Sequence, residues 1–217
     1  MVEAWIAAIP IGYLIGSIPV GLWVGRYLVG VDVRAGGSGK IGATNAYRRL
    51  GLRWSIAVFV ADVSKGVIPL VIVGAAFDSP TADVIAPLAT LIGHIYPVFA
   101  GFSGGRAAAT GIGAMSTLNP VAGVIALAVG VMILGVTRIM SLSVLLGMTV
   151  GAIAMGLMVA YGSDPDTYLA FTVISYLIVS FAHRDNIQRL ATGSERVLGR
   201  AARPATVAAA TVDAAGD

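Results

Sequence analysis

The sequence predicts an all-α integral membrane protein with seven transmembrane helices, its N-terminus outside and its C-terminus in the cytoplasm. Of its 217 residues, 57% are hydrophobic and only 12% are charged, and the mean hydropathy is +0.88. A surface that faces water needs far more charge, so one membrane domain is expected to occupy nearly the whole chain. The chain has no cysteine, which excludes disulfides, iron–sulfur clusters and a cysteine nucleophile.

Apolar runs between polar breaks approach the ~30 Å thickness of the hydrocarbon core and predict the membrane helices. They cover residues 4–29, 54–77, 84–102, 120–137, 141–161 and 166–182. The first run continues past Pro10 and Pro19 without a small-residue cleavage pattern, so we expect a membrane helix and not a removable signal peptide. A shorter seventh helix is expected from Thr110 to Leu118, because Pro120 starts a helix more readily than it continues one.

The basic side chains predict the orientation of these helices. Lysine and arginine lie between Arg26 and Lys65, at Arg106, at Arg138, and from Arg184 onward. The connections without a basic residue are residues 78–83, 118–120 and 161–166. The positive-inside rule then places the basic loops in the cytoplasm and the N-terminus outside. Arg106 and Arg138 lie on the same side of the membrane only if the chain crosses it twice between them. Residues 120–137 supply one crossing, so the short segment before them must supply the other, and seven helices are expected.

The chain is expected to divide into a seven-helix membrane domain at residues 1–190 and a cytoplasmic tail at residues 191–217. The tail ends in an alanine-rich, low-complexity segment, and such segments are typically disordered. Pairs of small residues four apart, such as Gly12 and Gly16, allow helices to approach closely. We expect these pairs to pack helices within one bundle, so a monomer is favoured over a dimer.

A glycine-rich basic segment, "GGSGKIGATNAYRRLG" at residues 36–51, interrupts the apolar sequence. Its Gly-x-Gly-x-x-Gly spacing formally matches a dinucleotide fingerprint, but no βαβ unit fits between two membrane helices. A Walker A loop is excluded because Ile41, and not Ser or Thr, follows Lys40. The segment is instead suited to phosphate, through converging backbone N–H groups, hydroxyls and a guanidinium. The candidate groups are Gly37, Ser38, Gly39, Thr44, Asn45 and Arg48.

A second segment, "GGRAAATG" at residues 104–111, repeats this pattern. Gly104 and Gly105 precede the cation Arg106 and an expected helix start, and a helix N-terminus attracts anions. Two such loops on one face suggest one phosphorylated ligand, or two. The alternative is a pair of solvated loops whose basic residues only obey the positive-inside rule and contact anionic lipid headgroups.

Other polar residues are expected at the same cytoplasmic face. Asp62 and Lys65 lie three apart on one helix face and are expected to form a buried pair that braces the first loop. His94 lies within the third apolar run, where we expect a hydrogen-bonded structural role. His183 and Asn186 are one helical step apart, and His183 is a candidate proton acceptor or hydrogen-bond donor to phosphate. Two histidines and scattered acids predict no metal site, and no cofactor is expected.

Together these segments resemble the bacterial acyl-phosphate-dependent glycerol-3-phosphate acyltransferases of the PlsY type. The resemblance rests on "GSIPVG" at 16–21, "GSGKIGATNAYRRLG" at 37–51, "DVSKG" at 62–66, "GHIYPVFAGFSGGRAAAT" at 93–110 and "HRDNIQRL" at 183–190. It implies a multi-pass enzyme of the bacterial cell membrane with its active site facing the cytoplasm. Such an enzyme transfers a fatty acyl group from acyl phosphate to the 1-hydroxyl of glycerol 3-phosphate, giving lysophosphatidic acid for phospholipid synthesis.

The resemblance also implies which residues act. The implied catalytic residues are Ser38, Arg48, Arg106, His183 and Asn186. We expect the arginines and both glycine loops to bind phosphate, Ser38 to orient a substrate or the oxyanion, and His183 with Asn186 to bind glycerol phosphate. The expected partners are glycerol 3-phosphate, fatty acyl phosphate and membrane lipids, with no nucleic acid. The hydroxyl proton has two candidate acceptors, His183 and a substrate phosphate oxygen.

Three positions depart from the usual family pattern. Lys40 stands where Asn is usual, Arg106 where Lys is usual, and Ala107 where Gly is usual. Arg106 keeps the charge but replaces a point cation with a planar fork, and Ala107 replaces a residue that is free to adopt positive φ. Two alternatives therefore stay open: a family member with lost or altered activity, and a small transporter of an organic phosphate. The acyl chain length, and the choice between acyl phosphate and acyl-CoA as donor, also stay open.

Overall fold

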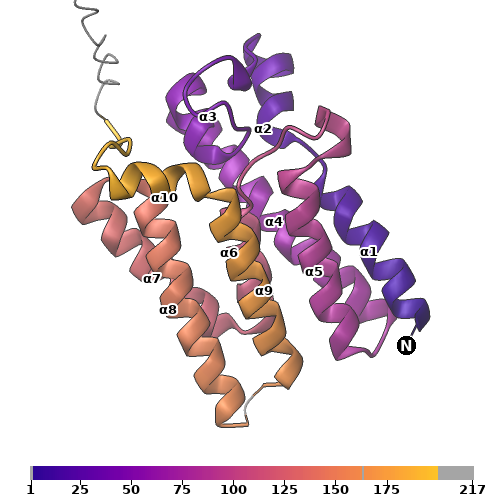
Figure 1. The fold of residues 1–217 in the computed structure, drawn as a ribbon. Coiled ribbons are helices and arrows are strands. Elements are labelled where there is room, and N and C mark those ends of the chain that lie inside the picture. The colour runs from indigo at the N-terminus through magenta and orange to yellow at the C-terminus, as the bar shows by residue number, and fades with distance from the viewer. Residues whose placement is uncertain (1, 163, 200–217) are drawn as a thin grey trace, which may run out of the picture.

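The computed structural model describes residues 2–162 and 164–199, and these residues are helical with no β-strand (Figure 1). The α-helices are α1 (Val2–Gly16), α2 (Val20–Trp23), α3 (Ala43–Leu50), α4 (Leu52–Ala76), α5 (Pro80–Ile95), α6 (Ala108–Leu118), α7 (Pro120–Thr137), α8 (Met140–Ala160), α9 (Asp166–Ala182) and α10 (Arg184–Ala191). Shorter turns are the π-helical η1 (Val24–Val29) and the 3-10 helices η2 (Val33–Ala35) and η3 (Val98–Ala100). The all-α prediction is confirmed, and most of the predicted tail, residues 200–217, lies outside the described residues.

The first predicted span is divided by proline and glycine. α1 ends at Gly16, and the chain resumes in α2 after Pro19, whose missing N–H cannot join a helical hydrogen-bond ladder. η1 ends at Gly30, which adopts the left-handed region with φ of 75°. The whole stretch Glu3–Val29 still has the length and apolarity of one membrane span. The predicted first helix is therefore present as an apolar unit, but it is broken between Gly16 and Val20.

Later helix boundaries follow the local capping residues. α7 and α9 begin and end where the apolar runs predicted. α5 begins before the predicted run because Ser79 caps it through its side-chain oxygen and Pro80 fits the first helical turn. α5 ends at Ile95 because Pro97 disfavours a helical conformation of the residue before it.

Five helical stretches in the described chain are long and apolar enough to cross a membrane. They are Glu3–Val29, Leu52–Ala76, Pro80–Ala100, Pro120–Thr137 and Met140–Ala160. A sixth is added if α9 and α10, which are bent by 67°, count as one span. α6 has 11 residues, so at 1.5 Å per residue it is about 16 Å long and too short to span a bilayer alone. The architecture is that of a helical integral membrane protein.

Glycines bring α1 into direct contact with α5. A Cβ atom added at Gly12 would meet the carbonyl oxygen of Ala86, and one at Gly16 would meet that of Thr90. Gly93 of α5 faces the backbone of α1 in the same way. The two backbones therefore touch, and Gly12 and Gly16 pack within the bundle as predicted.

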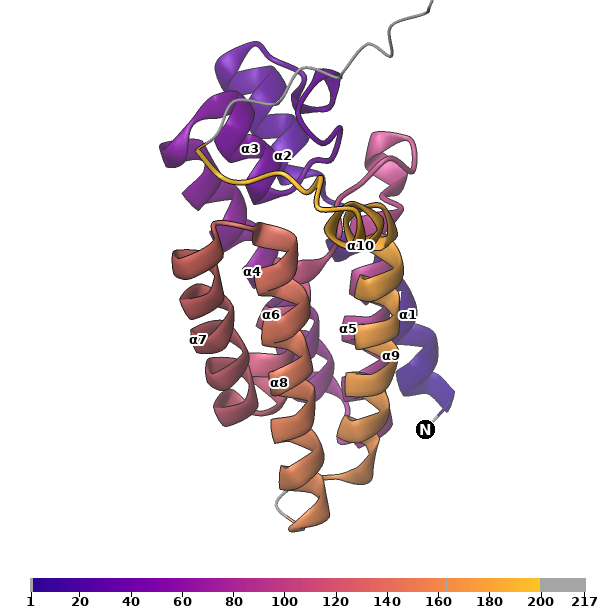
Figure 2. The ribbon, with the colours of Figure 1, turned by 60° about the vertical axis from the view of Figure 1, so that its left-hand side comes forward.

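The remaining helices are arranged around the short α6. α6 lies between α4 and α7, α7 packs along α8, and α5 packs against α9 (Figures 1 and 2). Met115 of α6 and Phe171 of α9 are fully buried in the largest apolar cluster. α3 and α10 lie at one end of the bundle, and the start of α1 and the α8–α9 connection lie toward the other (Figure 2). The polar segments of the sequence thus gather at the α3/α10 end.

Candidate active site

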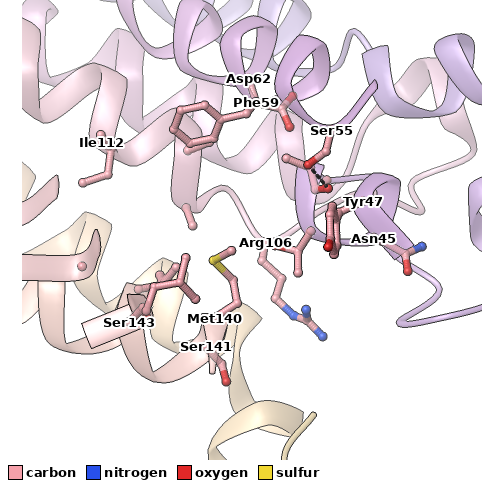
Figure 3. Close-up of a pocket in the computed structure, with 18 of the residues that line it drawn as sticks. Asn45, Tyr47, Ser55, Phe59, Asp62, Arg106, Ile112, Met140, Ser141 and Ser143 are labelled. Carbon is pink, nitrogen blue, oxygen red and sulfur yellow. Dashed lines mark hydrogen bonds between the residues drawn. The ribbon is translucent and has the colours of Figure 1, made fainter. Parts of the chain in front are cut away.

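A cavity of ≈ 460 Å³ opens at the α3/α10 end of the bundle (Figure 3). Its polar part is lined by the loops before α3 and α6, the α9–α10 junction and the segment after α10. Its apolar part runs between α4, α6, α7 and α8. The apolar lining includes Ile56, Phe59, Ile112, Val131, Leu134 and Met148. One cavity therefore joins a polar end to a groove lined with hydrocarbon.

The loop before α3 is closed by the side chain of Asn45, which is 1% exposed. Asn45 Oδ1 accepts the backbone N–H of Ser38 at 2.9 Å. Asn45 Nδ2 donates to the carbonyls of Val33 at 2.7 Å and Lys40 at 2.8 Å. A Cβ atom at Gly37, where φ is 63°, would overlap Asn45 Oδ1, so this close approach requires glycine. The amide of Asn45 thus bonds to the loop itself and fixes its shape.

This loop and α3 bring several predicted residues to the cavity. Ser38, Thr44 and Arg48 line it together with Asn45, and the Lys40 side chain lines it as well. Thr44 and Arg48 are four residues apart on α3 and therefore lie on one face. Two predicted glycines act through the backbone: Gly37 and Gly39, at φ of 63° and 69°, turn the chain on either side of Ser38.

The loop before α6 packs against His94. The N–H of Gly105 donates to the carbonyl of His94 at 3.0 Å. A Cβ atom at Gly105 would overlap the imidazole ring, and one at Gly104 would meet the carbonyl oxygens of His94 and Ile95. Glycine is therefore required at both positions. The backbone so held directs Arg106 into the space between α3 and the start of α8 (Figure 3).

Ala107 ends this loop in the left-handed region. Its φ is 58°, it precedes the first residue of α6, and its side chain is 1% exposed. The left-handed conformation costs a non-glycine residue roughly 1–2 kcal/mol. The departure from the usual glycine therefore falls on a residue whose backbone favours glycine.

A buried polar cluster lies behind the same loop. Lys65 Nζ donates to Asp62 Oδ1 at 2.7 Å, and the two side chains are 5% and 4% exposed. His94 Nδ1 lies 3.3 Å from Thr110 Oγ1 and 3.7 Å from Asp62 Oδ1. The predicted Asp62–Lys65 pair is present, but its partners lie in α5 and α6, at the ends of the loop of Arg106 and not at the first loop, which it was expected to brace. Asp62 and His94 also reach the lining of the cavity.

His183 and Asn186 enter the cavity from the junction of α9 and α10. His183 is 4% exposed, and its Nδ1 lies 2.8 Å from the carbonyl oxygen of Val179. A carbonyl only accepts, so Nδ1 carries the proton and Nε2 is the acceptor of the neutral ring. Burial lowers the pKa of His183 to about 4, which keeps the ring neutral at pH 7. Asn186 Nδ2 donates to Glu195 at 2.9 Å, and Asn186 Oδ1 is buried without a partner among the described residues.

Residues after α10 also line the cavity, and the sequence did not single them out. Glu195 Oε2 accepts a hydrogen bond from Arg189 Nε at 2.9 Å, and the Glu195 side chain is 6% exposed. The N–H of Leu198 donates to the carbonyl of Arg138 at 2.8 Å, which fastens this segment to the α7–α8 turn. Glu195, Arg196 and Leu198 are part of the lining. In the sequence, the sign of their role is an acidic residue next to a basic one, Glu195 and Arg196, shortly after a basic helix. This is a weak signal for a binding site.

Positive charge exceeds negative charge at the polar end. Arg48, Arg106 and Arg196 line the cavity, whereas the carboxylate of Glu195 is already paired with Arg189. Burial lowers the pKa of Arg48 and of Arg106, and nearby guanidinium groups lower both further. A guanidinium nevertheless stays charged at neutral pH. Arg106 Nε is buried with no hydrogen-bond partner in the part of the chain that the structure describes, so the site is suited to an anion. Within the same residues no group of three or more His, Cys, Asp or Glu could hold a metal ion.

Comparison with known sequences decides the family. The family model described as glycerol-3-phosphate acyltransferase matches residues 6–193. The chain belongs to this family. The glycerol-3-phosphate acyltransferase of Synechococcus sp. (strain CC9902) is 36% identical over 199 residues, which are 92% of this chain and 98% of the relative. That of Myxococcus xanthus (strain DK1622) is 40% identical over 191 residues, 88% of this chain and 97% of the relative.

Solved structures agree with the sequence comparison. PlsY (YgiH), an integral membrane glycerol 3-phosphate acyltransferase, superposes in its glycerol 3-phosphate form with a TM-score of 0.81 at 34% identity, covering 90% of this chain and 96% of PlsY. Its lysophosphatidic acid form superposes with a TM-score of 0.79 at 34% identity, covering 90% and 95%. The resemblance inferred from the sequence motifs is thereby confirmed.

The bonding of Asn45 predicts that Asn45→Asp destabilises the protein. A carboxylate cannot donate to the carbonyls that the amide now satisfies, so we expect a loss of stability of about 2–3 kcal/mol. Thermal unfolding in detergent measures it. Gln188→Glu, the same amide-to-acid change on the exposed surface of α10, is the control and should leave the Tm unchanged. An equal Tm for Asn45→Asp and wild type would contradict the role of Asn45.

The backbone of Ala107 predicts opposite effects of two substitutions. Ala107→Gly should raise stability by up to about 1 kcal/mol, because relief of left-handed strain outweighs the entropy cost of glycine. Ala107→Val should lower it, since a β-branched residue is a steric outlier at positive φ. The Tm of both variants in detergent, compared with wild type, tests this. Stabilisation by valine would show that the backbone at 107 is not left-handed.

Proposed function

We propose that this chain is an acyltransferase that moves a fatty acyl group from acyl phosphate to the 1-hydroxyl of glycerol 3-phosphate. The product is lysophosphatidic acid, a precursor for phospholipid synthesis. The observation that carries the proposal is the cavity, because its cationic end suits phosphates and its groove suits a hydrocarbon chain. Family membership, and the glycerol 3-phosphate and lysophosphatidic acid forms of PlsY, support the same substrates.

The two phosphate groups are assigned to the arginines and the second loop. Arg48 and Arg106 each present a planar fork of N–H donors, which matches two oxygens of a phosphate. Arg106 also lies two residues before the first residue of α6, at a helix start where unpaired backbone N–H groups favour an anion. These cations have no paired carboxylate among the described residues, so a phosphate is the charge that balances them.

Glycerol 3-phosphate is assigned to the α9–α10 junction. His183 Nε2 is an acceptor in the neutral ring, and Asn186 Oδ1 is a second buried acceptor with no partner in the described chain. Both suit glycerol hydroxyls, which donate hydrogen bonds. Ser38, on the opposite loop, is assigned to orient a substrate oxygen at the reacting carbonyl.

The reaction is substitution at an activated carbonyl. The 1-hydroxyl oxygen forms a bond to the acyl carbon, and the bond from that carbon to the phosphate oxygen breaks, so inorganic phosphate leaves with the electron pair. The hydroxyl proton passes to an acceptor: the chain offers His183 Nε2, and the substrates offer their phosphate oxygens. Phosphate is a good leaving group, so the protein chiefly holds two anions together and stabilises the developing charge.

The placement in the membrane follows the same proposal. We infer seven crossing helices in a bacterial cell membrane, with the N-terminus outside and the cavity open to the cytoplasm. Arg106 and Arg138 lie at the α3/α10 end, which the positive-inside rule assigns to the cytoplasm. Asn119, after α6, hydrogen-bonds to Asp164 in the α8–α9 connection, which supports a crossing by α6 and its preceding loop. Phe59 and Val131, 40% and 59% exposed, line the groove on its lipid side and would admit the acyl chain.

Substitution of the cavity cations tests the function. Arg48→Ala, Arg106→Ala and His183→Ala should each lower kcat/KM for acyl transfer by about 100-fold or more, because each removes a charged or polar contact at the reacting groups. Transfer to radiolabelled glycerol 3-phosphate measures it. Arg184→Ala removes an arginine side chain that is 60% exposed and should retain activity. Full turnover by all three cavity variants would contradict the assignment.

The donor test separates the enzyme from its alternatives. When the protein is supplied with acyl phosphate and glycerol 3-phosphate, it should form lysophosphatidic acid, because the cavity has room for a phosphate head beside the groove. Acyl-CoA is offered in a separate reaction and should support less transfer. A sealed-vesicle flux assay runs in parallel. Uptake of glycerol 3-phosphate without acyl transfer would favour a transporter, and neither activity would favour a family member that has lost its function.

A further inference from the structure

Ser141, the second residue of the 21-residue helix α8, lies at the cavity and takes no part in the contacts described above. Ser141 is 4% exposed and lines the cavity. Its Oγ has no hydrogen-bond partner among residues 2–162 and 164–199. A buried hydroxyl without a partner is unfavourable, so this atom is placed where a ligand can satisfy it.

The start of α8 provides further donors at the same place. Ile139 precedes the helix and supplies no side-chain cap, and the first helical bond runs from the N–H of Ser143 to the carbonyl of Ile139. The N–H groups of the residues between them have no carbonyl of their own helix to bond, and they carry the positive end of the helix dipole. An anion at this terminus would accept hydrogen bonds both from these N–H groups and from the hydroxyl of Ser141.

The position of Ser141 indicates which anion. The same helix contributes Val144 and Met148 to the wall of the apolar groove, so Ser141 lies where the groove meets the polar end. Figure 3 shows Ser141 and Met140 on one side of the cavity and Tyr47 on the other, with Arg106 directed between them. Acyl phosphate has its anionic head at the point where the hydrocarbon chain ends. Glycerol 3-phosphate has no chain that would hold it against this wall.

We propose that Ser141 and the N-terminus of α8 bind the phosphate head of the acyl donor, with the Ser141 hydroxyl donating to a phosphate oxygen. This inference rests on the proposed function and deepens it, because it gives the donor a phosphate site separate from the contacts of glycerol 3-phosphate with His183 and Asn186. Ser141 touches the substrate in this arrangement and completes the grip of Arg106 from the opposite side of the cavity.

Another serine of the chain provides a matched control. Ser17 is also buried, at 0% exposure, and its Oγ also has no partner in the described chain. Ser17 lies between α1 and α2 and is not part of the cavity lining. Ser17→Ala and Ser141→Ala therefore remove the same kind of unpaired hydroxyl, and only the second removes it from the cavity.

The kinetic test compares the KM values of the two substrates for the full chain in detergent. Ser141→Ala should raise the KM for acyl phosphate by roughly 10-fold or more, the effect of a lost hydrogen bond to a charged group. The KM for glycerol 3-phosphate should stay within about two-fold of wild type. Ser141→Thr keeps the hydroxyl and should restore the wild-type KM, and Ser17→Ala should change neither value. An unchanged KM for acyl phosphate in Ser141→Ala, or an increase only for glycerol 3-phosphate, would overturn the proposal.

A binding test separates this inference from the proposed function. Inorganic phosphate should raise the Tm of the wild type, because a ligand that binds the folded state stabilises it. The midpoint of this effect should shift to roughly 10-fold higher phosphate in Ser141→Ala. If the wild-type protein shows no acyl transfer, the proposed function is contradicted. The difference in phosphate midpoint between wild type and Ser141→Ala still decides whether Ser141 binds phosphate. Identical phosphate midpoints in the two proteins would show that Ser141 does not bind phosphate.

Discussion

Positive charge held at the edge of a hydrocarbon groove is the constraint on which the site depends. Arg48 and Arg106 are partly buried and repelled by neighbouring guanidinium groups, so the backbone around them must hold its shape before any anion arrives. Neutral hydrogen bonds do this: the amide of Asn45 closes one loop, and the bond from Gly105 to His94 fixes the other. Glu195 pairs with Arg189, and neither Arg48 nor Arg106 has a carboxylate partner among the described residues.

The same constraint explains why irregular backbone is found so close to the membrane. Backbone N–H and C=O groups near hydrocarbon are tolerated outside helices only where protein or a water-filled cavity satisfies them. Both loops meet this condition with bonds internal to the bundle, and the buried pair of Asp62 and Lys65 lies behind the second.

Apolar runs and glycine spacing made the long helices after residue 51 and both loops predictable, since these features depend on neighbours in the sequence. The break of the first span and the helix α3 were not predicted. α7 and α9 end where the apolar runs end, and Ser38, Arg48 and Arg106 lie in segments whose chemistry is local. Glu195 and Ser141 were not predicted, because their position at the cavity depends on tertiary contacts. In the sequence alone, Ser141 cannot be distinguished from the other small residues of an apolar helix. Its hydroxyl is unsatisfied in the described chain because it lies in the first turn, where no carbonyl of α8 precedes it, whereas Ser143 Oγ bonds back to Ile139.

Backbone strain marks the same end of the molecule. In the described chain the non-glycine residues with φ in the left-handed region are Phe102, Ala107 and Arg138. Phe102 and Ala107 lie on either side of the Gly104–Gly105 pair, and Arg138 separates α7 from the helix that begins with Met140 and Ser141. Such conformations persist only where surrounding contacts impose them, and they cluster at functional sites. The bond from Leu198 to the carbonyl of Arg138 is one such contact, so the segment after α10 helps to hold the start of α8 against the cavity.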